Sequence, residues 1–118
     1  MGLARTAAAI FGVVYVLVGV VGFFMTSPLF GLFPVSLLHN VAHVVLGAIL
    51  LWGAMSTPAA ITATRVVGAV LLVLGVLGFV NPLGDTLPLG GNDIWLHLAS
   101  GVILLGVGFM TAAEPSTA

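Results

Sequence analysis

The side chains best suited to chemistry in this 118-residue chain are its histidines and one aspartate, which fall into two matching groups. His39 and His43 stand four residues apart, and Asp93 and His97 repeat that spacing later in the chain. Because residues four apart share one face of a helix, each group predicts a polar stripe on one helix. Each stripe leads to a glycine one turn further on, where a small residue allows close packing: Gly47 and Gly101.

The first interpretation of these residues is structural. Asp93 or Asn92 would cap the fourth helix, because such side chains accept the free N–H groups of a first helical turn. Ser36 or Asn40 would help to start the second helix in the same way. The histidines would then hydrogen-bond between helices, as polar side chains do inside membrane proteins, and no cofactor would be bound.

The second interpretation is haem binding. Imidazole is a common axial ligand, and His43 and His97 would approach one b-type haem from two different helices. The sequence offers a single pair of this kind, so such a haem would serve sensing or electron transfer on one side of a membrane.

The third interpretation is a metal or proton site made of His39, His43, Asp93 and His97. Imidazoles and carboxylates bind zinc, and both groups also carry protons. The four side chains would form a cluster of three or four ligands, or a relay for proton or small-solute transport. The metal is left open by the sequence, with His43 and His97 as its candidate ligands.

Several other kinds of chemistry are excluded by what the sequence lacks. Without cysteine there is no disulfide, thiolate metal site or thiol nucleophile. The net charge is −1, and with only two basic residues no surface for nucleic acid can be assembled. A phosphate-binding loop and a nucleophile paired with a base are also missing. We therefore predict a protein that is not an enzyme and binds no nucleic acid.

The composition predicts where the polar stripes must lie. Apolar residues make up 61% of the chain and charged residues 4%, whereas about a quarter of a soluble domain is charged. A helix needs about 20 apolar residues to cross a membrane. Four runs have this character, at residues 6–25, 36–55, 58–80 and 93–112. The sequence therefore predicts one all-α domain over residues 1–118, a four-helix transmembrane bundle.

Two arginines predict the orientation of this bundle. Arg5 precedes the first run and Arg65 comes early in the third, so both fall on the same side of the membrane. Because positive residues favour the cytoplasmic side, we predict that both termini are cytoplasmic and that the protein lies in the cytoplasmic membrane. Its expected partners are membrane lipids, with other membrane proteins or a second copy as further candidates.

The chain also resembles itself, in halves that cover residues 5–55 and 58–112. The segment Val-Gly-Val-Val-Gly-Phe at residues 18–23 matches Leu-Gly-Val-Leu-Gly-Phe at residues 74–79, 56 residues later. His43 matches His97, 54 residues later. We therefore predict two repeated helical hairpins related by an axis along the membrane normal, with both histidines at equal depth near the outer interface.

The two histidine motifs are Leu-His-Asn-x-x-His-x-x-x-Gly from Leu38 and Asn-Asp-x-Trp-Leu-His-x-x-x-Gly from Asn92. They resemble a bacterial membrane family, frequent in actinobacteria, known as domain of unknown function 4383. The resemblance extends from about Arg5 to Thr111 and implies a short protein with four spans, but no activity. We expect a non-enzymatic accessory or packing protein of the cytoplasmic membrane. The alternative is a haem- or metal-binding redox or sensor protein.

Overall fold

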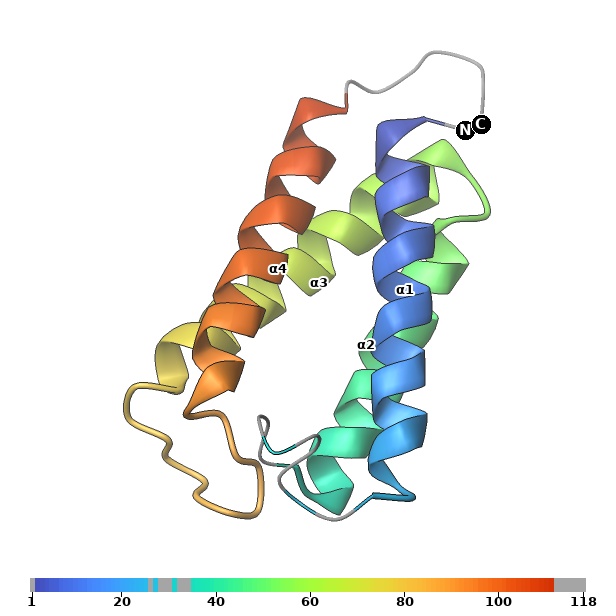
Figure 1. Ribbon diagram of the computed structural model, residues 1–118. Helices are drawn as coiled ribbons and strands as arrows, with labels where there is room; N and C mark the ends of the chain where they lie inside the picture. Colours follow the sequence, from blue (N-terminus) through green and yellow to red (C-terminus); the bar gives the residue numbers. More distant parts are fainter. Residues whose placement is uncertain (1, 26, 28–30, 32–34, 112–118) are drawn as a thin grey trace.

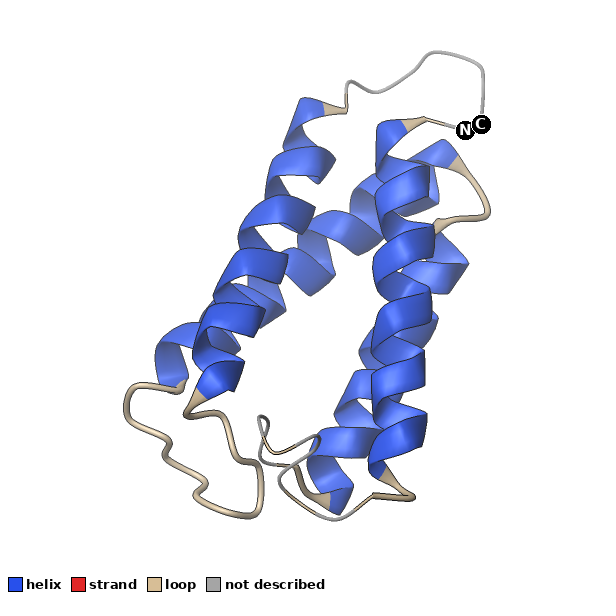
Figure 2. Ribbon diagram, in the orientation of Figure 1, coloured by secondary structure: helices blue, strands red, loops and turns tan. Residues whose placement is uncertain are grey.

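The computed structural model describes residues 2–25, 27, 31 and 35–111, and these residues form four α-helices without a strand (Figures 1 and 2). The helices are α1 (Leu3–Gly22), α2 (Leu37–Gly53), α3 (Thr57–Leu77) and α4 (Asn92–Met110). The predicted all-α class and the predicted order of four helices are therefore confirmed.

Two of the helices start at a serine cap. The hydroxyl of Ser36 accepts the N–H of His39 at 3.1 Å, just before α2, and that of Ser56 accepts the N–H of Ala59 at 3.2 Å, just before α3. A hydroxyl at this position satisfies a free N–H of the first turn. The side-chain cap predicted for α4 is wrong, because the cap position belongs to Gly91. That residue has a φ of 64°, in the left-handed region that glycine adopts readily.

The helix bounds differ from the predicted runs by one to three residues. α1 begins three residues early, so Arg5 lies inside the helix instead of before it. α1 ends at Gly22, and α3 ends at Leu77 instead of Val80. At the end of α3 the N–H of Val80 bonds the carbonyl of Leu77 at 3.0 Å, a tighter turn than that of an α-helix. The predicted end of the last run, at 112, lies outside the described residues.

The lengths and compositions of the helices indicate a membrane-embedded protein. α1, α3 and α4 have 20, 21 and 19 residues and are apolar enough to cross a membrane, and α2 is apolar but shorter, with 17 residues. Spanning helices have about 17–25 residues. Large apolar side chains such as Ile10, Val73 and Val102 are more than half exposed, which suits contact with lipid.

The bundle consists of two hairpins, because α1 packs mainly against α2 and α3 mainly against α4. We call the lower end in Figure 1, where α1 and α3 finish and α2 and α4 begin, the loop end. The opposite end, with the short connection from α2 to α3, is the terminal end. In these four helices, no Cα atom of α2 lies within 8 Å of one in α4. Side chains must therefore fill the space between α2 and α4.

Glycines allow the two helices of each hairpin to touch. A Cβ atom added at Gly47 of α2 would lie 2.8 Å from the carbonyl oxygen of Gly12 on α1. In the other hairpin, a Cβ atom added at Gly101 of α4 would lie 2.9 Å from the carbonyl oxygen of Gly68 on α3. Backbones that approach this closely leave no room for a side chain. Gly47 and Gly101 are therefore contact points between helices.

The two arginines bind helix ends at the terminal end. Nε of Arg5 on α1 donates to the carbonyl of Ala54, the C-cap of α2, at 2.9 Å. Nε of Arg65 on α3 donates to the carbonyl of Gly108 near the end of α4 at 3.0 Å, and its guanidinium lies 4.1 Å from the ring centre of Phe109. A positive group at a helix C-terminus is favourable because carbonyl groups there are unpaired and partly negative. Each arginine therefore joins the helices of its own hairpin.

Candidate functional site

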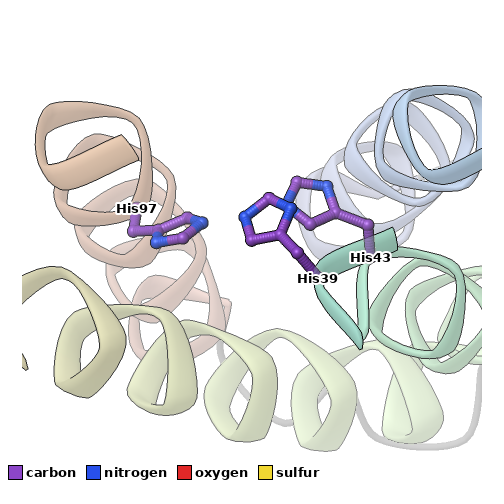
Figure 3. A group of neighbouring side chains, drawn as sticks. All are labelled: His39, His43 and His97. Carbon is purple, nitrogen blue, oxygen red and sulfur yellow. The ribbon is translucent and has the colours of Figure 1, made fainter. Parts of the chain in front are cut away.

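The four residues of the two predicted stripes meet in the space between α2 and α4. His39 and His43 come from the first two turns of α2, and Asp93 and His97 from the first two turns of α4. Figure 3 shows the rings of His39 and His43 on one side and that of His97 pointing toward them from the other. Each of the four residues is at most 4% exposed. The structure thus places all four near the loop end, buried between the hairpins.

The three imidazole rings converge. The ring centres of His39 and His43 are 4.4 Å apart, and that of His97 lies 6.1 Å from the first and 6.0 Å from the second. One nitrogen of each ring can be chosen so that the three atoms lie within 4.8 Å of one another. This geometry offers three nitrogen donors to a single small ion.

The carboxylate of Asp93 points into the same cluster. Its Oδ2 atom lies 3.4 Å from Nε2 of His39, and the residue is completely buried. The cap position before α4 belongs to Gly91, and Oδ1 of Asn92 accepts the indole N–H of Trp95 at 3.0 Å. Asp93 still lies in the first turn of α4, where the helix dipole favours a negative charge.

The polar atoms of the cluster are buried without hydrogen-bond partners among the residues that the structure describes. This applies to both ring nitrogens of His39 and His43, to Nδ1 of His97 and to both carboxylate oxygens of Asp93. Buried polar groups are hydrogen-bonded as a rule, and an unsatisfied one costs about 1–3 kcal/mol. So many unsatisfied donors and acceptors in one place are typical of a binding site.

Tyr15 is a residue of this site that the sequence analysis did not find. It reaches the cluster from α1, is 3% exposed, and stacks on His43 with ring centres 4.9 Å apart and planes 11° apart. A signal was present, because Tyr15 lies between Gly12 and Gly19, whose contacts face α2. The helical spacing of these three residues places Tyr15 on the α2 side of α1.

Ser100 lies one turn beyond His97 on α4 and is also buried, with 4% exposure. The hydroxyl of Tyr15 is buried without a hydrogen-bond partner among the described residues. Side chains of α1, α2 and α4 therefore all reach the cluster, although the stripes predicted only two of these helices.

Comparison with known proteins shows a family match. The family model described as Domain of unknown function (DUF4383) matches residues 5–110, which include both histidine stripes and nearly all of the four helices. No curated protein and no solved structure matches the chain.

Proposed function

The chain belongs to the Domain of unknown function (DUF4383) family, and on that premise we propose that it is a non-enzymatic membrane protein that binds one divalent transition-metal ion between its two hairpins. The ligands would be His39, His43 and His97, with Asp93 beside them. Zinc is the ion that best suits these donors, since it takes neutral imidazole nitrogen and carboxylate oxygen in a tetrahedral arrangement.

The observation that carries the proposal is the convergence of three buried imidazoles. In a tetrahedral zinc site with Zn–N distances of about 2.0–2.1 Å, neighbouring nitrogen atoms lie about 3.3 Å apart. The three nitrogens already lie within 4.8 Å of one another. Small rotations of the side chains would therefore bring them to one ion, without movement of α2 or α4.

Electrostatics favour a cation at this place. A carboxylate that is fully buried in an apolar bundle is expensive unless a positive partner compensates it. The described groups near Asp93 are histidines, and the arginines bind helix ends at the terminal end. A divalent ion would compensate the carboxylate and also satisfy the lone pairs of the imidazoles.

Asp93 would act on the ion through His39. Ligand histidines usually donate their second ring N–H to a carboxylate or carbonyl, which fixes the ring and strengthens the ligand. The 3.4 Å distance between Oδ2 of Asp93 and Nε2 of His39 supports this pairing. In this arrangement Nδ1 of His39 would face the ion.

The geometry favours an ion over haem. A porphyrin would have to lie between His43 and His97, whose ring centres are 6.0 Å apart. The ring of His39 lies 4.4 Å from one and 6.1 Å from the other, beside the line that joins them. A porphyrin at that place would overlap with His39, whereas a single ion would be bound by it.

We also propose that the site formed by duplication of one hairpin. Equivalent residues make equivalent contacts: Gly12 meets Gly47 as Gly68 meets Gly101. The helix-end carbonyls bound by the arginines, at Ala54 and Gly108, are 54 residues apart, as His43 and His97 are. With the same spacing, His39 corresponds to Asp93, so the cluster would lie on the axis between the repeats.

For its location we propose the bacterial cytoplasmic membrane, crossed four times, with both termini inside. The position of both arginines at the terminal end supports this orientation, because positive residues favour the cytoplasmic side. The metal cluster would then lie near the outer surface. Lipids are the expected neighbours of the exposed apolar side chains.

The test is metal analysis of the full chain purified in mild detergent from its native membrane, with an absorption spectrum of the same sample. We expect about one divalent metal ion per chain, with zinc as the expected metal, and we expect the ion to be absent from His43→Ala and from His97→Ala. Thr64→Val is the matched control, because Thr64 is a fully buried polar residue that bonds its own helix at Ala60. It should retain the ion.

Two results would count against the metal site. A Soret band that disappears in His97→Ala would show haem instead. A colourless, metal-free protein that also takes up no added Zn²⁺, and that folds normally as His43→Ala and His97→Ala, would leave only a packing role for the histidines.

A further inference from the structure

Tyr15 covers one face of the proposed metal site without being one of its ligands. Its ring lies nearly parallel to that of His43, with an angle of 11° and ring centres 4.9 Å apart. The tyrosine belongs to α1, whereas the proposed ligands belong to α2 and α4. It therefore connects a third helix to the site.

The orientation of His43 depends on such ring contacts. A ligand histidine is normally held by a hydrogen bond from its second ring nitrogen. Neither nitrogen of His43 has a hydrogen-bond partner among the described residues. The rings closest to it are those of His39, 4.4 Å away, and Tyr15. Stacking therefore takes the place of the usual hydrogen bond.

Packing alone does not call for a tyrosine at this position. Residue 71 stands 56 residues after Tyr15, and in the second hairpin it is Leu71, which is fully buried in the same apolar cluster. Leucine fills the corresponding place there without a polar atom. The tyrosine hydroxyl is instead buried without an aligned partner, which is unfavourable in an apolar interior. The presence of a tyrosine at this position is therefore explained better by its flat ring, which stacks on His43, than by the volume that the side chain fills.

We infer that Tyr15 is a positioning residue of the metal site, which holds the imidazole of His43 in the plane from which a nitrogen reaches the ion. This inference rests on the proposed function. It requires that metal binding depends on the aromatic ring of Tyr15 more than on its hydroxyl. It also requires that an aliphatic side chain at this position does not support metal binding as the ring does.

Binding of Co²⁺ to the purified full chain tests this role, because the visible absorption of the bound ion reports the geometry of its ligands. Tyr15→Phe should keep the wild-type band and affinity. Tyr15→Leu should bind Co²⁺ about tenfold more weakly, the loss expected when support of a ligand histidine is removed, with a changed band shape. Leu71→Val is the control and should lower thermal stability while leaving the Co²⁺ band unchanged.

Tyr15→Ile provides a second aliphatic variant of similar volume, in case the leucine variant does not fold. Wild-type affinity and an unchanged band in the folded aliphatic variants would overturn the positioning role alone. Failure of the wild-type protein to bind Co²⁺ or Zn²⁺ would instead overturn the proposed metal site, and this role with it.

Discussion

At the scale of single residues, the buried carboxylate of Asp93 distinguishes a metal site from simple packing. It is completely buried, and both of its oxygens lack a hydrogen bond among the described residues. If the cluster only packs, the buried carboxylate destabilises the fold, and its removal should not harm the protein. If the cluster binds a cation, the carboxylate strengthens cation binding, and its removal should weaken that binding.

Asp93→Asn should weaken Zn²⁺ binding by about 10–100-fold, the range found when the group that orients a ligand histidine is lost. Competition between the protein and a chromophoric chelator measures this change. Asp85→Asn is the matched control, because Asp85 is exposed in the connection between α3 and α4. Equal Zn²⁺ affinity in both variants and the wild type would contradict the role of Asp93.

Sequence reasoning predicted the residues of the cluster but not all of its contacts. The spacing of four residues determines that His39 and His43 share a face, and this holds in any α-helix. The stacking of Tyr15 on His43 depends instead on how α1 is rotated against α2. That rotation is set by the glycine contacts between the two helices, so the sequence analysis did not find the tyrosine.

At the scale of the helices, the glycine contacts determine how closely α1 approaches α2 and how closely α3 approaches α4. At Gly47 an added Cβ atom would meet Val16 at 2.6 Å, and at Gly101 it would meet Leu72 at 2.8 Å. At Gly106, also on α4, it would meet nothing within 4 Å. The same substitution should therefore have very different effects at these positions.

Gly47→Ala and Gly101→Ala should each destabilise the bundle by about 1–3 kcal/mol, because overpacking forces the helices apart. Gly106→Ala should be neutral or slightly stabilising, since alanine favours a helix over glycine by about 1 kcal/mol. Thermal unfolding in detergent, followed by circular dichroism, compares the three. Equal melting temperatures for all three variants would show that the close contacts are unimportant.

Helix order was predictable at this scale, whereas exact ends were not. Long apolar runs separated by proline and glycine are strong signals. The start of α4 was predicted with a side-chain cap at Asn92 or Asp93, and Gly91 occupies the cap position instead. Asp93 turns into the cluster between the helices, which is a tertiary contact that no local capping preference predicts. Oδ1 of Asn92 accepts the indole N–H of Trp95, three residues further along the same helix.

At the scale of the whole molecule, the proposed metal site lies at the loop end and the two arginines lie at the terminal end. The chain contains no cysteine, so a single introduced thiol reports its own position in the membrane. Asp85, in the connection from α3 to α4, represents the loop end. Met55, in the connection from α2 to α3, is 74% exposed and represents the terminal end.

In intact cells, Asp85→Cys should react with a membrane-impermeable maleimide, and Met55→Cys should react only after the membrane is opened. This result follows from the position of both arginines at the terminal end and the preference of positive residues for the cytoplasm. The reverse labelling pattern would show that the protein has the opposite orientation in the membrane. Labelling of both thiols in intact cells would contradict the four membrane crossings.

X-ray absorption at the zinc edge shows whether three histidines from the two hairpins bind one ion. The zinc-loaded full chain should show three imidazole nitrogens at about 2.0–2.1 Å from the ion. His97→Ala should lose this signal. A zinc shell of oxygen atoms without imidazole, or the same spectrum in wild type and His97→Ala, would contradict the claim.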